Sequence, residues 1–115
     1  MGTSPEQLQR ILVQLDPLPV TASRMFGEYA IRLADRIPAF VTDGVLGIKV
    51  TEVQDPRLTP DLLGPIYPGS KDYWRIPDRL LADGDWLREI LMETIAHVEP
   101  RKPKRPKASG SASRR

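Results

Sequence analysis

The chain has 115 residues, twelve of them proline and none of them cysteine, and its formal net charge is +2. This length fits one domain, and the lack of cysteine excludes disulfides, thiolate metal sites and cysteine nucleophiles. No run of about 18 apolar residues is present that would span a bilayer. The N-terminus also lacks the charged-then-apolar pattern of a signal peptide, so we expect a cytoplasmic protein with one hydrophobic core.

Charge is distributed unevenly along the sequence. All fifteen carboxylates precede residue 100, together with ten Arg and Lys, so residues 1–99 carry a formal charge of −5. The remaining sixteen residues carry seven basic side chains and no acid, a charge of +7. An acidic body is unlike the basic face of a domain that reads DNA. We therefore expect a folded domain over residues 1–99 and a disordered basic tail over residues 100–115.

The first apolar-periodic segment predicts a helix. Ser4 is a good N-cap, Pro5 suits the first helical position, and Gln7 completes a capping box. Apolar residues then recur at helical spacing up to Asp16. Pro17 disfavours helical geometry in the residue before it, so the helix should end there.

Two strands are expected next. Residues 20–25 are typical of an extended segment, a bend follows at Phe26–Gly27, and residues 28–33 alternate polar and apolar side chains. Residues 34–37 form a tight connection to the next strand. The length of that connection is ambiguous by one residue, which leaves the register of the next strand open.

Asp43–Gly44 predicts a two-residue hairpin turn, because both central residues of such a turn need positive φ. The turn pairs Phe40 with Gly47, where a bulky ring can cover bare backbone. Pro38 indicates that its strand begins at an edge or just outside the ladder. The side chains on the opposite face should form core, namely Ala39, Val41, Leu46, Ile48 and Val50.

The second half of the sequence predicts a short helical start at Thr59–Asp61, an aromatic strand at Tyr73–Ile76 and one helical turn at Pro77–Leu81. A final helix is capped by Asp83 or Asp85. Its apolar stripe should lie across the sheet and consists of Trp86, Leu87, Ile90, Leu91, Ile95 and Val98. The predicted fold is a single α+β domain, an antiparallel β-sheet of about five strands flanked by an N-terminal and a C-terminal helix.

Several motifs resemble the N-terminal domain of the TfoX/Sxy family. They are residues 24–29 (RMFGEY), residues 40–50 (FVTDGVLGIKV), Tyr67–Gly69 and Asp85–Leu87, and the resemblance spans residues 5–98. It implies an α+β domain with an antiparallel sheet and flanking helices. Two-domain members regulate bacterial natural competence together with a cyclic-AMP-responsive transcription factor. A basic tail takes the place of their second domain, so the resemblance implies a stand-alone, single-domain interaction or regulatory module.

No catalytic or metal-binding motif is apparent. His97 is the only histidine, and near the end of a helix it is expected to meet the last carbonyls. The sequence has no Gly-x-Ser-x-Gly motif and no phosphate-binding glycine loop. Capping already explains Asp83 and Asp85. We therefore expect no enzyme activity, no metal and no cofactor.

An aromatic patch with cations is the candidate binding site, and core packing is the competing interpretation. A protein partner is the first expectation, and the alternative is a small ligand or an unrecognised enzyme site near Phe26 and Lys49. A concave pocket ringed by Arg24, Tyr29 and Lys49 would favour the ligand. An open apolar edge would favour the interaction module. The candidate residues are Arg24, Phe26, Gly27, Tyr29, Lys49, Tyr73 and Trp74.

The tail offers a second candidate interface. Its cations alternate with prolines and would form an extended ribbon that can follow phosphates, giving weak, non-specific nucleic-acid contact. A tail that only aids solubility is the alternative. Homodimerisation through an edge of the sheet is a further expectation. The cations are Arg101, Lys102, Lys104, Arg105 and Lys107.

Overall fold

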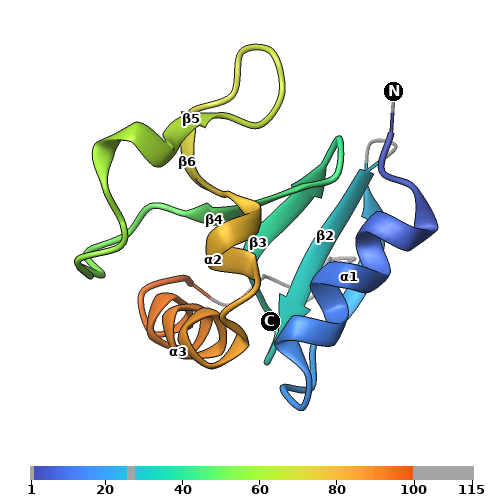
Figure 1. Cartoon of the computed structure of the whole chain (residues 1–115), viewed down its shortest axis with the longest axis horizontal. Helices are drawn as coiled ribbons and strands as arrows, with labels where there is room; N and C mark the ends of the chain where they lie inside the picture. Colours follow the sequence, from blue (N-terminus) through green and yellow to red (C-terminus); the bar gives the residue numbers. More distant parts are fainter. Residues whose placement is uncertain (1, 26–27, 100–115) are drawn as a thin grey trace, which may run out of the picture.

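The computed structural model describes residues 2–25 and 28–99. Within these ranges an antiparallel sheet of six strands carries three α-helices on one face (Figure 1). The order across the sheet is β1-β2-β3-β4-β6-β5. The strands are β1 (Thr21–Met25), β2 (Glu28–Leu33), β3 (Arg36–Thr42), β4 (Val45–Lys49), β5 (Leu63–Pro65) and β6 (Asp72–Ile76). The helices are α1 (Pro5–Leu15), the 3₁₀ helix η1 (Pro60–Leu62), α2 (Asp78–Leu81) and α3 (Gly84–Ile95).

The predicted α+β fold is therefore confirmed, with the short strand β5 added. Residues 63–65 follow η1, where the sequence indicated only the end of a short helix. They pair with β6, the aromatic strand, and so form one edge of the sheet. None of the helices in the described ranges is long and apolar enough to cross a bilayer.

The capping box predicted for α1 is present. Gln7 N–H donates to the Ser4 hydroxyl at 3.1 Å, and Ser4 N–H donates to the Gln7 side-chain oxygen at 2.8 Å. The helix ends at Leu15, and Asp16 is its extended C-cap, as Pro17 predicts. Ile11 and Leu15 are buried, so the apolar side of α1 packs against the sheet.

The connection between β2 and β3 settles the register that the sequence left open. Both residues of Ala34–Asp35 have positive φ, 55° and 65°. This two-residue turn pairs Leu33 with Arg36, and after an irregularity in the ladder Ile31 lies opposite Ala39. Ile31 and Ala39 are both fully buried, so the register places β2 and β3 with their apolar sides on the same core.

The hairpin predicted at Asp43–Gly44 is confirmed. The two turn residues have φ of 50° and 77°. Thr42 pairs with Val45, and Phe40 lies opposite Gly47. The core face predicted for β3 and β4 is correct except at Val50, which is 43% exposed. Val50 lies beyond the end of β4, so the alternation of the strand no longer directs its side chain.

The position predicted for Pro38 is right in part, because Pro38 lies just outside the β3–β4 ladder, but its strand is not at an edge and starts two residues earlier, at Arg36. Pro38 lies inside β3, a central strand, and is fully buried. Two features of the neighbouring ladders allow it there. Pairing between β3 and β4 begins only at Ala39, and the register between β2 and β3 shifts opposite this segment. A residue without an N–H is tolerated where the ladder is interrupted.

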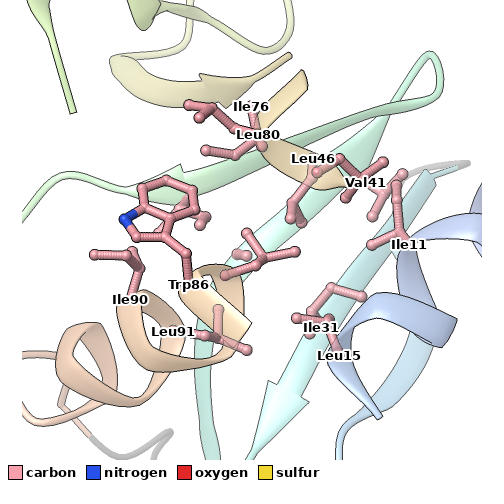
Figure 2. Close-up of a cluster of buried hydrophobic side chains, with 14 of the residues drawn as sticks. Ile11, Leu15, Ile31, Val41, Leu46, Ile76, Leu80, Trp86, Ile90 and Leu91 are labelled. Atoms are coloured by element: carbon pink, nitrogen blue, oxygen red, sulfur yellow. The ribbon is translucent and has the colours of Figure 1, made fainter. Parts of the chain in front are cut away.

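One apolar core joins the helices to the sheet (Figure 2). Asp83 caps α3, because its carboxylate accepts a hydrogen bond from Trp86 N–H. The predicted stripe on α3 is buried as far as Ile95, where the helix ends, whereas Val98 lies past the end and is only half-buried. The side chains in Figure 2 come from α1, the sheet, α2 and α3 and include Ile11, Leu15, Ile31, Val41, Leu46, Leu80, Trp86, Ile90 and Leu91.

Candidate functional site

The sheet has one face that the three helices do not cover, and we call it the open face. The buried apolar side chains of α1, α2 and α3 all belong to the cluster that contains Val41 and Ile48. Neighbouring residues along a strand point to opposite faces. Phe40 and Lys49 therefore point to the open face, and so does Tyr73, the cross-strand partner of Lys49.

Two aromatic rings and two lysines form a cluster on the open face, which we call the lysine–aromatic cluster. The rings of Phe40 and Tyr73 meet edge to face, with centroids 5.9 Å apart and planes at 87°. The Lys49 ammonium lies 5.8 Å from the Phe40 ring centroid, and the Lys71 ammonium lies 5.9 Å from that of Tyr73. Both distances allow a cation–π interaction.

The cluster brings two positive charges together. Within the described residues, neither Lys49 nor Lys71 makes an ion pair. Partial burial lowers the pKa of Lys49 below 10.5, and the Lys71 charge lowers that pKa further. Burial, and secondarily Tyr67, raises the pKa of Tyr73 above 10.0. The cluster is therefore a place where an added negative charge would be favourable.

An apolar groove of about 570 Å³ adjoins the cluster on the open face. Phe40 belongs to both. The loop after β5 forms the far wall of the groove, where Tyr67 is 56% exposed. A Cβ at Gly47 would lie 2.6 Å from the Ile66 side chain, so Ile66 covers the bare backbone that Phe40 was predicted to cover. The lining residues are Met25, Glu28, Phe40, Thr42, Asp43, Ile66, Tyr67 and Pro68.

Two of the polar side chains around the groove, Glu28 and Thr42, are already hydrogen-bonded within the fold. The Glu28 carboxylate accepts hydrogen bonds from the Thr3 hydroxyl at 2.7 Å and from Asp43 N–H at 3.3 Å. The Thr42 hydroxyl donates to the Ile66 carbonyl at 2.8 Å. The surface that remains for a ligand is therefore mainly apolar.

The residues predicted to form one patch lie on two faces of the sheet. Lys49 and Tyr73 lie on the open face. Arg24, Tyr29 and Trp74 lie on the other face, where Tyr29 and Trp74 pack against the core. The Arg24 guanidinium lies 5.4 Å from the Tyr29 ring centroid and donates to its hydroxyl at 3.1 Å. Arg24 and Tyr29 therefore do not share a pocket with Lys49.

The other predicted site residues lie outside the described ranges. They are Phe26 and Gly27 in the β1–β2 connection and the tail cations Arg101, Lys102, Lys104, Arg105 and Lys107.

Sequence reasoning missed Phe40 and Lys71 in the cluster and the groove lining from Met25 and residues 66–68. Phe40 could have been predicted, because the Asp43–Gly44 hairpin already places its side chain on the same face of the sheet as Lys49. No sequence pattern predicted residues 66–68 in the groove, because only the return of the chain after β5 brings Ile66 over β4.

The helix layer contains a second hollow of about 550 Å³ between α1 and α2. One ion pair crosses it, since Arg10 contacts the Asp78 carboxylate at 3.0 Å. His97 lies apart from both hollows, 41% exposed and 3.9 Å from the Glu52 carboxylate, while its backbone N–H donates to the Thr94 carbonyl. In residues 2–25 and 28–99, no three His, Asp or Glu side chains are arranged to hold a metal ion.

A helical layer on one face of an antiparallel sheet, with an apolar groove on the other, defines a two-layer α+β domain. Residues 11–98 match the family model described as the TfoX N-terminal domain. The chain is also 30% identical, over 108 residues and 93% of each chain, to an uncharacterised 12.7 kDa protein in the trpE 5′ region of Spirochaeta aurantia. The chain belongs to the TfoX N-terminal domain family, in agreement with the resemblance of its motifs.

Proposed function

We propose that this domain is a non-enzymatic interaction module whose open face binds a segment of a protein partner. The observation that carries the proposal is the position of Phe40, which lies between an apolar groove and two lysines that make no ion pair within residues 2–25 and 28–99. One partner segment of ordinary length can contact both features at once.

The composition of the groove favours a protein surface as its occupant. Met, Phe and Tyr are enriched in protein–protein interfaces, and all three occur among the lining residues. Tyr67 and Pro68 are exposed on the far wall, so apolar area is available for burial. Burying it would contribute roughly 25 cal/mol per Å² before the cost of association.

The lysine–aromatic cluster supports a partner that carries a carboxylate beside an apolar side chain. Burial first, and then repulsion by Lys71, lowers the pKa of Lys49, and such a carboxylate would offset the repulsion. The remainder of the folded body is acidic, so the cluster is a local exception to its charge. Complementary charge of this kind fixes register and speeds encounter more than it raises affinity.

A small-ligand site is the second candidate, because the groove volume lies within the roughly 300–1,000 Å³ of ordinary ligand pockets. Such pockets also carry several convergent polar groups that fix the ligand. Here Glu28 and Thr42 are engaged within the fold. The protein partner is therefore the stronger candidate.

A regulatory role is part of the proposal, by similarity with the two-domain relatives that act with a transcription factor. The basic tail would add weak, non-specific nucleic-acid contact to the same complex.

Affinity capture from lysate of the source organism, after nuclease treatment, tests the proposal with matched variants. Tyr67→Ala removes an exposed groove residue, and Met92→Ala removes an apolar residue of similar exposure, 47%, on α3. Lys71→Glu reverses a charge in the cluster, and Arg79→Glu makes the same change on the helix layer. A protein retained by wild type should be lost about tenfold or more with the first variant of each pair, a cost of about 1.4 kcal/mol. Equal recovery with all four variants would contradict the proposal.

A further inference from the structure

The two edges of the sheet differ in their capacity to accept another strand. At one edge β5 has only three residues and ends at Pro65, which has no N–H to donate. At the other edge β1 has five residues without proline, and all five pair regularly with β2. In the described part of the chain, β1 makes no backbone hydrogen bond to any segment other than β2. Among residues 2–25 and 28–99, therefore, no other strand pairs with the outer edge of β1.

The pairing of β1 with β2 determines which backbone groups point away from the sheet. Met25 faces Glu28 across a connection of two residues, and the pair that closes such a connection is hydrogen-bonded. Hydrogen-bonded and non-hydrogen-bonded pairs then alternate along the ladder. Ser23 therefore bonds to β2, whereas Ala22 and Arg24 direct their N–H and C=O groups outward.

We infer that β1 pairs antiparallel with β1 of a second copy of this chain, about a two-fold axis at Ser23. Ala22 of each copy then lies opposite Arg24 of the other, and the outward groups of both residues form four hydrogen bonds across the interface. The two sheets join into one continuous sheet. This inference is independent of the proposed binding at the open face.

The side chains of β1 suit this register. The small side chain of Ala22 lies opposite the long one of Arg24, and Thr21 lies opposite Met25 of the second copy. The Arg24 guanidinium is directed onto Tyr29 of its own chain, so it does not block the edge. A register centred on Arg24 would place two like charges opposite each other, which is unfavourable.

The absence of cysteine makes a disulfide test of the register clean. In the inferred dimer Ser23 forms a non-hydrogen-bonded pair with its own copy, and the Cα atoms of such a pair are about 4.5 Å apart. That spacing lies within the range of disulfides, about 4.4–6.8 Å. Under mild oxidation Ser23→Cys should give a covalent dimer. Thr21→Cys, two residues away on the same face, should remain monomeric because it meets Met25. Equal cross-linking of both variants, or none of either, would overturn the inference.

Light scattering on the full chain tests the association itself. Wild type at millimolar concentration should reach twice the monomer mass of 12.9 kDa. Ala22→Pro removes an outward N–H that the sheet does not use, so the variant should fold and remain at the monomer mass. Circular dichroism and a melting curve check that the variant is folded. A monomer mass for wild type at that concentration would exclude the dimer.

Discussion

Lys49 and Tyr73 are cross-strand partners on the open face of the sheet, and Lys71 lies over the ring of that same tyrosine. The arrangement holds two cations close together on a domain whose folded part is otherwise acidic. Such a grouping is costly for the isolated fold. It is readily explained if another molecule supplies the missing negative charge.

The pKa of Lys49 should lie below 10.5 in the folded protein, and Lys71→Gln should raise it because a neighbouring positive charge is removed. NMR titration of the lysine side chain measures both values. If Lys71→Gln leaves the pKa of Lys49 unchanged, the two ammonium groups do not interact.

The same lowered pKa predicts how stability depends on pH. In the pH range below both the folded and the unfolded pKa, Lys49 is charged in both states, and the folded state carries the cost of burial and repulsion. As pH rises through the lowered folded pKa towards 10.5, that cost disappears. Lys49→Met should therefore raise the melting temperature at pH 7, and its advantage should shrink towards pH 10.5. A lower melting temperature for the variant at pH 7 would mean that the contact with Phe40 outweighs the cost.

The wall of the groove should depend on Gly47. A Cβ there would clash with Ile66, so Gly47→Ala should destabilise the fold by about 1–3 kcal/mol, as overpacking does. Ile66→Ala makes room for the added methyl group. The double variant should therefore be more stable than the sum of the single effects predicts, by more than about 0.5 kcal/mol. Urea unfolding of the four proteins measures this coupling, and additive effects would contradict the contact.

The start of α3 should depend on Asp83 as a hydrogen-bond acceptor. Its carboxylate accepts from Trp86 N–H and contacts Arg57 at 2.6 Å. Asp83→Ala should lower the melting temperature more than Asp83→Asn, because asparagine is also a good N-cap. The Arg57 contact first, and then the cap hydrogen bond, hold the pKa of Asp83 below 3.8. The advantage of wild type over Asp83→Asn should therefore be complete above pH 3.8 and fade as pH falls through the lower folded pKa. An equal drop in melting temperature for both variants would mean that the charge of Asp83, and not its role as a hydrogen-bond acceptor, stabilises the helix.

If the five cations from Arg101 to Lys107 neutralise phosphates, the logarithm of duplex-DNA affinity should fall with the logarithm of salt concentration, with a slope near about −4.5. Truncation after Glu99 should remove the binding. Fluorescence anisotropy with a labelled duplex measures both. Unchanged binding by the truncated chain would exclude the tail as the contact.

Local signals predicted the elements of this fold well. The Ser4–Gln7 capping box, the Asp43–Gly44 turn and the helical spacing in α3 each depend on a few neighbouring residues. The place of Pro38 inside a central strand was not predicted, because it depends on interruptions in two neighbouring ladders, which no local pattern reports. Strand β5 was missed because three residues ending in proline carry almost no periodicity.

The candidate site was predictable only in part, for a geometric reason. Composition alone grouped Tyr29 with Lys49, but the pairing of four strands decides which face each side chain takes. A shift of one residue in any of these ladders would move the side chains of that strand to the opposite face of the sheet. The Asp43–Gly44 hairpin predicts the pairing of β3 with β4, and therefore that Phe40 and Lys49 share a face. The pairing of Lys49 with Tyr73 joins β4 to β6 across a long connection, and no pattern in the sequence predicts that register.

Photo-cross-linking in the source organism tests the central claim, that the open face binds a protein partner. A benzophenone amino acid would replace Tyr67 on the groove wall, and in a matched control it would replace Met92 on α3. We predict that illumination yields a discrete adduct with a cellular protein from position 67 and none from position 92. Adducts from position 92 alone, or from neither position, would contradict the account.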